Sequence, residues 1–132
     1  MNAAERAALL EWVAEHRCCS VCHWPESDGR RRLEVHHIIG GAGRKHDPRN
    51  YLRLCDRCHG VYHSGKVYGC HEDLDKRILL GVKKECDPDN YDPEFLAYLK
   101  HKKHLGYEPA SLPHYYLQER ERNTGSWTSR TP

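Results

Sequence analysis

EVHHII at residues 34–39 and LCDRCHGVYH at residues 54–63 decide the fold of this chain. Alternating apolar residues predict a short strand over residues 33–38, and residues 51–54 form a second one. Residues 39–50 between them are a loop punctuated by glycine and proline. Residues 56–64 then predict a helix, with Gly65 in the position of a C-cap glycine. The order strand, long loop, strand, helix predicts a small α+β unit.

Helices are predicted on both sides of this unit. On the N-terminal side, Asn2 and Glu5 form a capping-box pattern, and an alanine-rich helix should run to about His16. We therefore expect a core with its N-terminal helix over residues 1–65. The remaining residues, 66–132, should form a helical C-terminal extension.

The extension has three candidate helices of its own. Residues 74–85 have helical spacing that is interrupted by Gly81. Residues 92–105 begin with Asp92 as N-cap and a proline in the first turn, which is a strong helix start. Residues 113–122 form a third helix that is dense in charge. The tail at 123–132 lacks apolar periodicity, so we predict that it is mobile.

Two C-x-x-C pairs, separated by the strand and loop, predict a structural zinc site. Thiolates at this local spacing reach one tetrahedral ion without strain. A thin apolar core, with 38% hydrophobic residues, makes such a metal useful to the fold. An odd total of seven cysteines and no apolar leader favour zinc in a reducing cytoplasm over disulfides. The predicted ligands are Cys19, Cys22, Cys55 and Cys58.

The other three cysteines have no clear place in this site. Cys18 competes with Cys19, but the pair Cys18/Cys22 would break the two-residue spacing. Cys70 and Cys86 have no obvious partner. We interpret them as small buried or spectator thiols.

Four histidines and an asparagine predict a second, catalytic site. His59 and His63 lie one turn apart on the predicted helix, so both imidazoles point the same way and can bind one metal. We expect His36 to be the third ligand and His37, a neutral imidazole near pH 7, to be a general base. Asn50 carries no charge and should orient the loop near His37. Because adjacent residues in a strand face opposite sides, the strand would need to end or twist early for both histidines to enter one site.

Charge placement favours an anionic substrate more than the total charge does. The net charge is only +2 and the pI near 8.2, which is weak evidence for a nucleic-acid partner. Arg44 and Lys45 lie close after the double histidine and Arg30–Arg32 just before it, as a basic collar suited to phosphate. An ordinary solvated loop explains Arg30–Arg32 equally well. No apolar run is long enough to span a membrane, so none is expected.

Residues 19–65 resemble an HNH endonuclease of the ββα-metal type with a treble-clef zinc scaffold. The resemblance is carried by CSVC, VHHI, DPRNY and LCDRCH, over roughly a third of the chain. It implies that His37 activates water, that Asn50 is the structural asparagine and that His59 binds metal. Many members have aspartate where this chain has His36, and a histidine there together with His63 is more similar to colicin-type nucleases. Three imidazoles suit zinc, nickel, cobalt or manganese better than magnesium.

The resemblance also implies DNA as the partner, with the ββα unit pressed into the minor groove. Arg44 and Lys45 should contact phosphates that flank the cut, with Arg53 and Arg57 as second-tier candidates. We expect the acidic C-terminal helices to cover the core, form a dimer contact or dock on another protein. Residues 83–94 resemble small HNH proteins of phages and prophages, which suggests the host-cell cytoplasm and phage DNA processing, packaging or homing.

The leading hypothesis is a metal-dependent DNA endonuclease that makes nicks or double-strand cuts. The alternative is a non-catalytic zinc module that binds DNA or a partner in a phage packaging complex, and a third reading is a structural adaptor of that complex. A zinc scaffold alone would need only the four cysteines and gives no reason for His37, Asn50 and His59. The sequence leaves open the preferred ion, the cleavage specificity and the oligomeric state.

Overall fold

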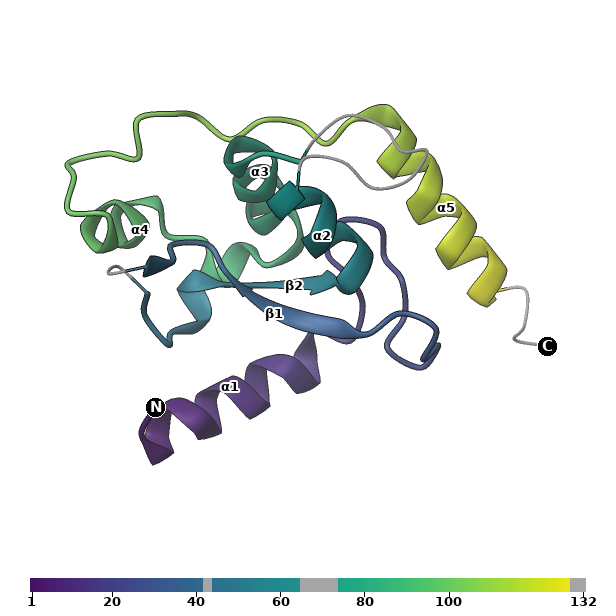
Figure 1. Ribbon diagram of the computed structural model, residues 1–132, viewed down its shortest axis with the longest axis horizontal. Helices are drawn as coiled ribbons and strands as arrows, with labels where there is room; N and C mark the ends of the chain where they lie inside the picture. The colour runs from purple at the N-terminus through teal and green to yellow at the C-terminus, as the bar shows by residue number, and fades with distance from the viewer. Residues whose placement is uncertain (42–43, 65–73, 129–132) are drawn as a thin grey trace.

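A two-stranded antiparallel sheet and one helix form the centre of the protein in the computed structural model, which describes residues 1–41, 44–64 and 74–128. Strand β1 spans Leu33–His37 and strand β2 spans Tyr51–Cys55, with Leu33 opposite Cys55 and His37 opposite Tyr51. Helix α2, Asp56–Ser64, follows β2 directly and lies over one face of the sheet (Figure 1). The predicted order of strand, loop, strand and helix is confirmed. Gly65 and Cys70 lie outside the described residues.

The N-terminal helix contacts the opposite face of the sheet. Helix α1 spans Ala3–Glu15 and has the complete capping box between Asn2 and Glu5 that the sequence predicts. Its one buried residue is Trp12, whose ring packs against Tyr51 of β2 with 5.3 Å between ring centroids. Tyr51 pairs with His37 on this face, and Figure 1 shows α1 and α2 on different sides of the hairpin.

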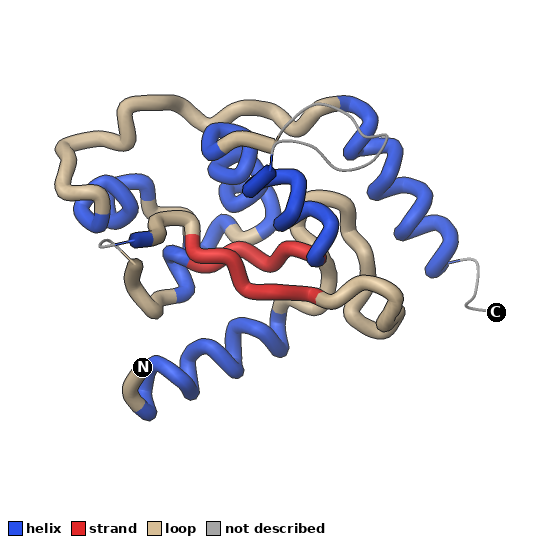
Figure 2. The backbone as a smooth tube through the Cα atoms, viewed as in Figure 1, coloured by secondary structure: helices blue, strands red, loops and turns tan. Residues whose placement is uncertain are grey.

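The described part of the extension contains three α-helices and a 3-10 turn. Helix α3 passes through Gly81 without a break. A Cβ at Gly81 would clash with the backbone carbonyl of Ala110, so glycine lets the chain cross the helix closely. Figure 2 shows how much of the chain beyond the hairpin is helical. The elements are α3 (Lys76–Cys86), η3 (Pro88–Asn90), α4 (Pro93–Leu99) and α5 (His114–Thr128), and η2 (Pro48–Asn50) precedes β2.

Two helix ends differ from the sequence prediction. Helix α4 ends at Leu99 and not near residue 105, because His101 takes a left-handed backbone conformation with φ of 58°. Helix α5 continues to Thr128, through residues predicted to be a mobile tail. Asn123 donates from Nδ2 to the carbonyl of Cys22 over 2.7 Å, and this polar contact anchors a stretch that lacks apolar periodicity.

One hydrophobic cluster joins the hairpin, α2 and the later helices. Leu52 and Leu54 of β2 are fully buried, as are Leu79 and Leu80 of α3 and Leu96 of α4. The hairpin, α2 and the helices of the extension therefore share one core. In the residues described, no helix has the length and apolar content needed to cross a membrane.

Candidate metal centres and active site

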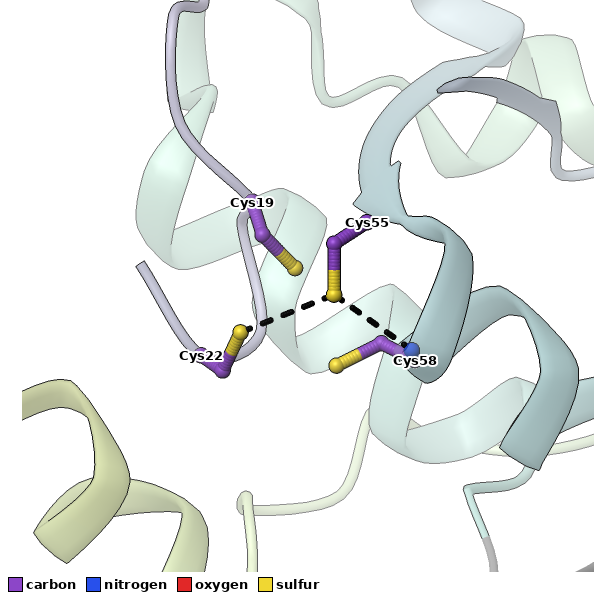
Figure 3. A group of neighbouring side chains, drawn as sticks. All are labelled: Cys19, Cys22, Cys55 and Cys58. Atoms are coloured by element: carbon purple, nitrogen blue, oxygen red, sulfur yellow. Dashed lines mark hydrogen bonds between the residues drawn. The ribbon is translucent and has the colours of Figure 1, made fainter. Parts of the chain in front are cut away.

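The four predicted cysteines converge into one buried cluster (Figure 3). Cys19 and Cys22 come from the loop after α1, Cys55 ends β2, and Cys58 lies in the first turn of α2. The four sulfur atoms all lie within 4.8 Å of one another, and Cys22 Sγ is 3.8 Å from Cys55 Sγ. Four buried sulfurs at this spacing fit a tetrahedral Zn²⁺ site.

The electrostatics of the cluster also fit a bound cation. Hydrogen bonds with the neighbouring thiols, of which that with Cys19 has the largest effect, lower the pKa of Cys55. The hydrogen bond with Cys19 is also the largest cause that raises the pKa of Cys58. Four adjacent buried thiols therefore cannot all ionise without a positive charge between them. Arg31 supplies part of that charge, with Nη1 3.5 Å from Cys22 Sγ. Cys18 is exposed and takes no part in this cluster.

Three histidines form a second donor set at the junction of sheet and helix. His36 Nδ1 of β1 is 3.2 Å from His59 Nε2 of α2, and His63 Nε2 is 3.0 Å from the same atom. His36 is buried, which together with the neighbouring His59 lowers its pKa to about 3. Three imidazoles whose nitrogens lie within 4.8 Å of one another can hold one divalent ion.

Glu34 supports this triad, although the sequence analysis did not single it out. Its Oε1 lies 3.0 Å from His59 Nδ1, the ring nitrogen that does not face the other histidines. A carboxylate at that place fixes the tautomer and orientation of a metal-binding imidazole. The signal was available in the sequence, because Glu34 precedes His36 by two residues and so shares its face of the strand.

Glu34→Gln is expected to weaken metal binding at the triad by about 10- to 100-fold, because an amide holds the His59 imidazole less strongly than a carboxylate. Calorimetric titration of zinc-loaded protein with Ni²⁺ measures this change. Glu26→Gln, a carboxylate beside Arg17 and outside the triad, is the matched control and should bind as the wild type does. Equal affinities for the two variants would remove Glu34 from the site.

The side chain of His37 lies on the face of β1 that is opposite the triad. The strand continues through His37, so the early strand end that the sequence analysis required is not present. The His37 ring lies edge-on to Tyr51, and its Nε2 is 3.4 Å from His46 Nδ1. Burial, followed by the charges of Arg44 and His46, lowers the pKa of His37 to about 4, so its imidazole is neutral at pH 7. His46 lies in the loop between the strands and has no motif of its own that would have marked it as a neighbour of His37.

Asn50 fastens the loop that follows His37. The side chain is fully buried at the end of η2. Its Oδ1 accepts from the Ile39 N–H over 2.8 Å, and its Nδ2 donates to the carbonyls of Ile39 and Lys45 over 3.0 and 3.1 Å. One amide thereby ties together the start and the end of the loop.

The four basic residues selected from the sequence lie in different environments. Arg44 and Lys45 are exposed on the loop before η2. Arg53 is only 5% exposed, and burial lowers its pKa, which weighs against a phosphate contact. Arg57 donates from Nη1 to Glu119 of α5 over 2.9 Å, so its charge is largely engaged within the protein.

A β-hairpin followed by a helix, with a histidine triad between them and a cysteine cluster beneath, defines the class as a small ββα-metal domain. Residues 19–65 match the family model of the HNH endonucleases, and this confirms the resemblance. The matched segment includes both donor sets, His37 and Asn50. The match of this segment to the HNH model indicates a nuclease-type or nucleic-acid-related function. Neither a curated protein nor a solved structure matches the chain.

Proposed function

We propose that the protein is a metal-dependent HNH endonuclease that hydrolyses phosphodiester bonds in DNA. The observation that carries the proposal is the pair of donor sets. The cysteine cluster accounts for a scaffold, and the triad of His36, His59 and His63 is a second site that a scaffold does not need.

The triad would hold a divalent ion, which when bound supplies positive charge to the scissile phosphate and to the departing 3′ oxygen. His37 takes the proton from the attacking water on its imidazole. Asn50 keeps the loop after His37 closed and so limits the positions that its imidazole can take. His46, 3.4 Å from His37, helps to orient that ring.

The edge of β1 gives His37 and the triad access to the same phosphate. In the described sheet β1 pairs only with β2, so its other edge has no strand partner. A phosphodiester laid along this edge meets the triad from one face and His37 from the other. This placement removes the need for the two adjacent side chains to point the same way. Arg44 and Lys45, exposed on the adjoining loop, would contact neighbouring phosphates without reading sequence.

The chemical setting of the proposal follows from the donor atoms. Three imidazoles favour Zn²⁺, Ni²⁺, Co²⁺ or Mn²⁺ as the catalytic ion over Mg²⁺, which prefers oxygen ligands. The resemblance of residues 83–94 to small phage HNH proteins supports a role in phage DNA processing in the host cytoplasm. The alternative, a zinc-binding module of a packaging complex, would bind DNA or protein without cutting.

Incubation of supercoiled plasmid with the zinc-loaded protein and one divalent ion at a time tests the proposal. The wild type is expected to convert the plasmid to nicked or linear DNA with at least one ion. His59→Ala should reduce the rate by more than about a hundredfold, because loss of a metal ligand costs more than loss of a residue that only hydrogen-bonds to one.

His114→Ala, an exposed histidine at the start of α5, is the matched control and should cut normally. Intact plasmid with every ion, despite DNA binding, would favour the module over the enzyme.

A further inference from the structure

A basic turn follows α4 outside the segment that matches the HNH family. It consists of residues 100–104, with the sequence KHKKH, and contains three lysines, two histidines and no acidic residue. Residues 101–104 are all exposed. The left-handed backbone at His101 ends the helix here and turns the chain sharply. From the sequence this stretch is predicted to be the end of a helix over residues 92–105, in an extension that is acidic as a whole.

The lysines of the turn carry positive charge that no described carboxylate pairs with. Within the described residues, none of the three forms an ion pair. Glu94 and Glu108 are exposed and line the same pocket as Lys103, yet they are not paired with it. By contrast, Arg30 and Arg32 before β1 are paired with Asp28 and Glu34. The turn is therefore a more available source of positive charge than the arginine run next to the hairpin.

Helix α4 holds the turn beside the loop of the candidate active site. Arg49 of η2 stacks on Phe95 of α4, with its guanidinium carbon 3.5 Å from the ring centroid, and donates to Asp92 over 3.4 Å. The turn thus begins one short helix away from the loop that carries Arg44 and Lys45. Figure 1 shows α4 at the same end of the molecule as this loop, with α5 at the other end.

A second route connects the turn to the histidine triad. Lys76 donates from Nζ to the carbonyl of Ile38, directly after β1. Burial first, and then the charge of nearby Lys100, lowers the pKa of Lys76. The Lys76 ammonium also lies 5.9 Å from the Tyr62 ring, which packs 4.9 Å from His36. Lys76, which lies near Lys100, therefore joins the end of β1 and the triad side of the sheet to the start of the turn.

We propose that residues 100–104 are a second DNA-backbone contact surface, which extends the candidate active site beyond the HNH segment. The inference rests on the proposed function for the identity of the partner. Duplex DNA is the partner whose chemistry fits, because Arg44, Lys45 and the lysines of the turn are exposed cations on two segments that the contact between Arg49 and Phe95 holds together. Contacts of this kind add affinity and position the duplex, and they do not select a sequence.

The double variant Lys102→Ala/Lys103→Ala tests the surface with the full chain. Binding of a fluorescent DNA duplex is measured by anisotropy in the His37→Ala background, where no cutting intervenes. Two lost phosphate contacts should reduce the slope of log affinity against log salt by about 1.8. Over a change from about 50 to about 200 mM salt, the variant should therefore lose about tenfold less affinity than its parent.

The control is Arg17→Ala/Arg122→Ala, which removes the same charge from two exposed arginines, one on α5 and one after α1. An unchanged slope in the lysine variant, or an equal change in both variants, would overturn the inference. Plasmid cleavage by the wild type is measured separately. Cleavage with no role for the turn refutes only this surface, whereas a turn-dependent salt slope without any cleavage refutes only the proposed enzyme activity.

Discussion

Replacing His37 with alanine is expected to abolish DNA cleavage while leaving the fold and the zinc content intact. A positioned general base contributes about a hundredfold to ten-thousandfold to a hydrolytic rate, so the loss should be of that size. The fold should survive because the His37 ring is only half-buried and contacts His46 and Tyr51 at their edges. The measurement is the single-turnover rate on supercoiled plasmid with saturating metal, beside circular dichroism and zinc analysis.

Two comparisons distinguish a base from a structural residue. Added imidazole should restore part of the activity of His37→Ala, because the small molecule can occupy the vacated space and accept the proton. His46→Ala keeps the base and loses only its neighbour, so its rate should fall less. Unchanged cleavage by zinc-replete His37→Ala protein would remove His37 from the mechanism.

The parts of this site that the sequence predicts are those set by local spacing. Two residues separate Cys19 from Cys22, one helical turn separates His59 from His63, and each pair contributes to one of the two donor sets. The end of β2 and the first turn of α2 bring Cys55 and Cys58 to the first cysteine pair, and β1 brings His36 to the histidine pair. Glu34 was missed although strand alternation predicts its position, since attention to histidines and cysteines passed over a carboxylate with a supporting role.

The parts that sequence reasoning could not predict depend on contacts far apart along the chain. Arg120 donates to the carbonyls of Ser20 and Val21 over 2.7 Å each, across nearly the whole sequence. Polar contacts of this kind do not require apolar residues at helical spacing, so the sequence prediction ends α5 at residue 122 instead of residue 128. Arg53 looked available for DNA because its charge was read without its place in β2, where it is buried. The acidic character of the extension likewise concealed the basic turn at residues 100–104.

Further contacts of helix α5 support the cysteine cluster. Glu119 of α5 binds Arg57 in the first turn of α2 and lies 3.9 Å from Arg31, which in turn contacts Cys22 Sγ. Asn123 holds the carbonyl of Cys22. Helix α5 therefore supports the cysteine cluster in two ways, by binding the Cys22 carbonyl and by holding Arg31, which contacts Cys22 Sγ. The stability of the extension and the stability of the metal site should consequently be linked.

Loss of zinc from the cysteine cluster is expected to unfold the core. Structural zinc contributes an apparent binding free energy of about 10 to 16 kcal/mol at pH 7, which equals or exceeds the roughly 5 to 15 kcal/mol net stability of an ordinary domain. The cluster joins the loop after α1, the end of β2 and the start of α2, so no strand or helix of the centre is independent of it. Cys58→Ala should therefore lower the melting temperature by at least about 10 °C and release the metal.

Thermal melting followed by circular dichroism, with zinc analysis of the same samples, makes the measurement. Cys18→Ala is the matched control, because Cys18 is exposed and outside the cluster, and it should keep both its zinc and its melting temperature. Loss of zinc from Cys18→Ala would instead make Cys18 a ligand in place of Cys19. If Cys58→Ala melted as the wild type does, the apolar core alone would suffice for folding.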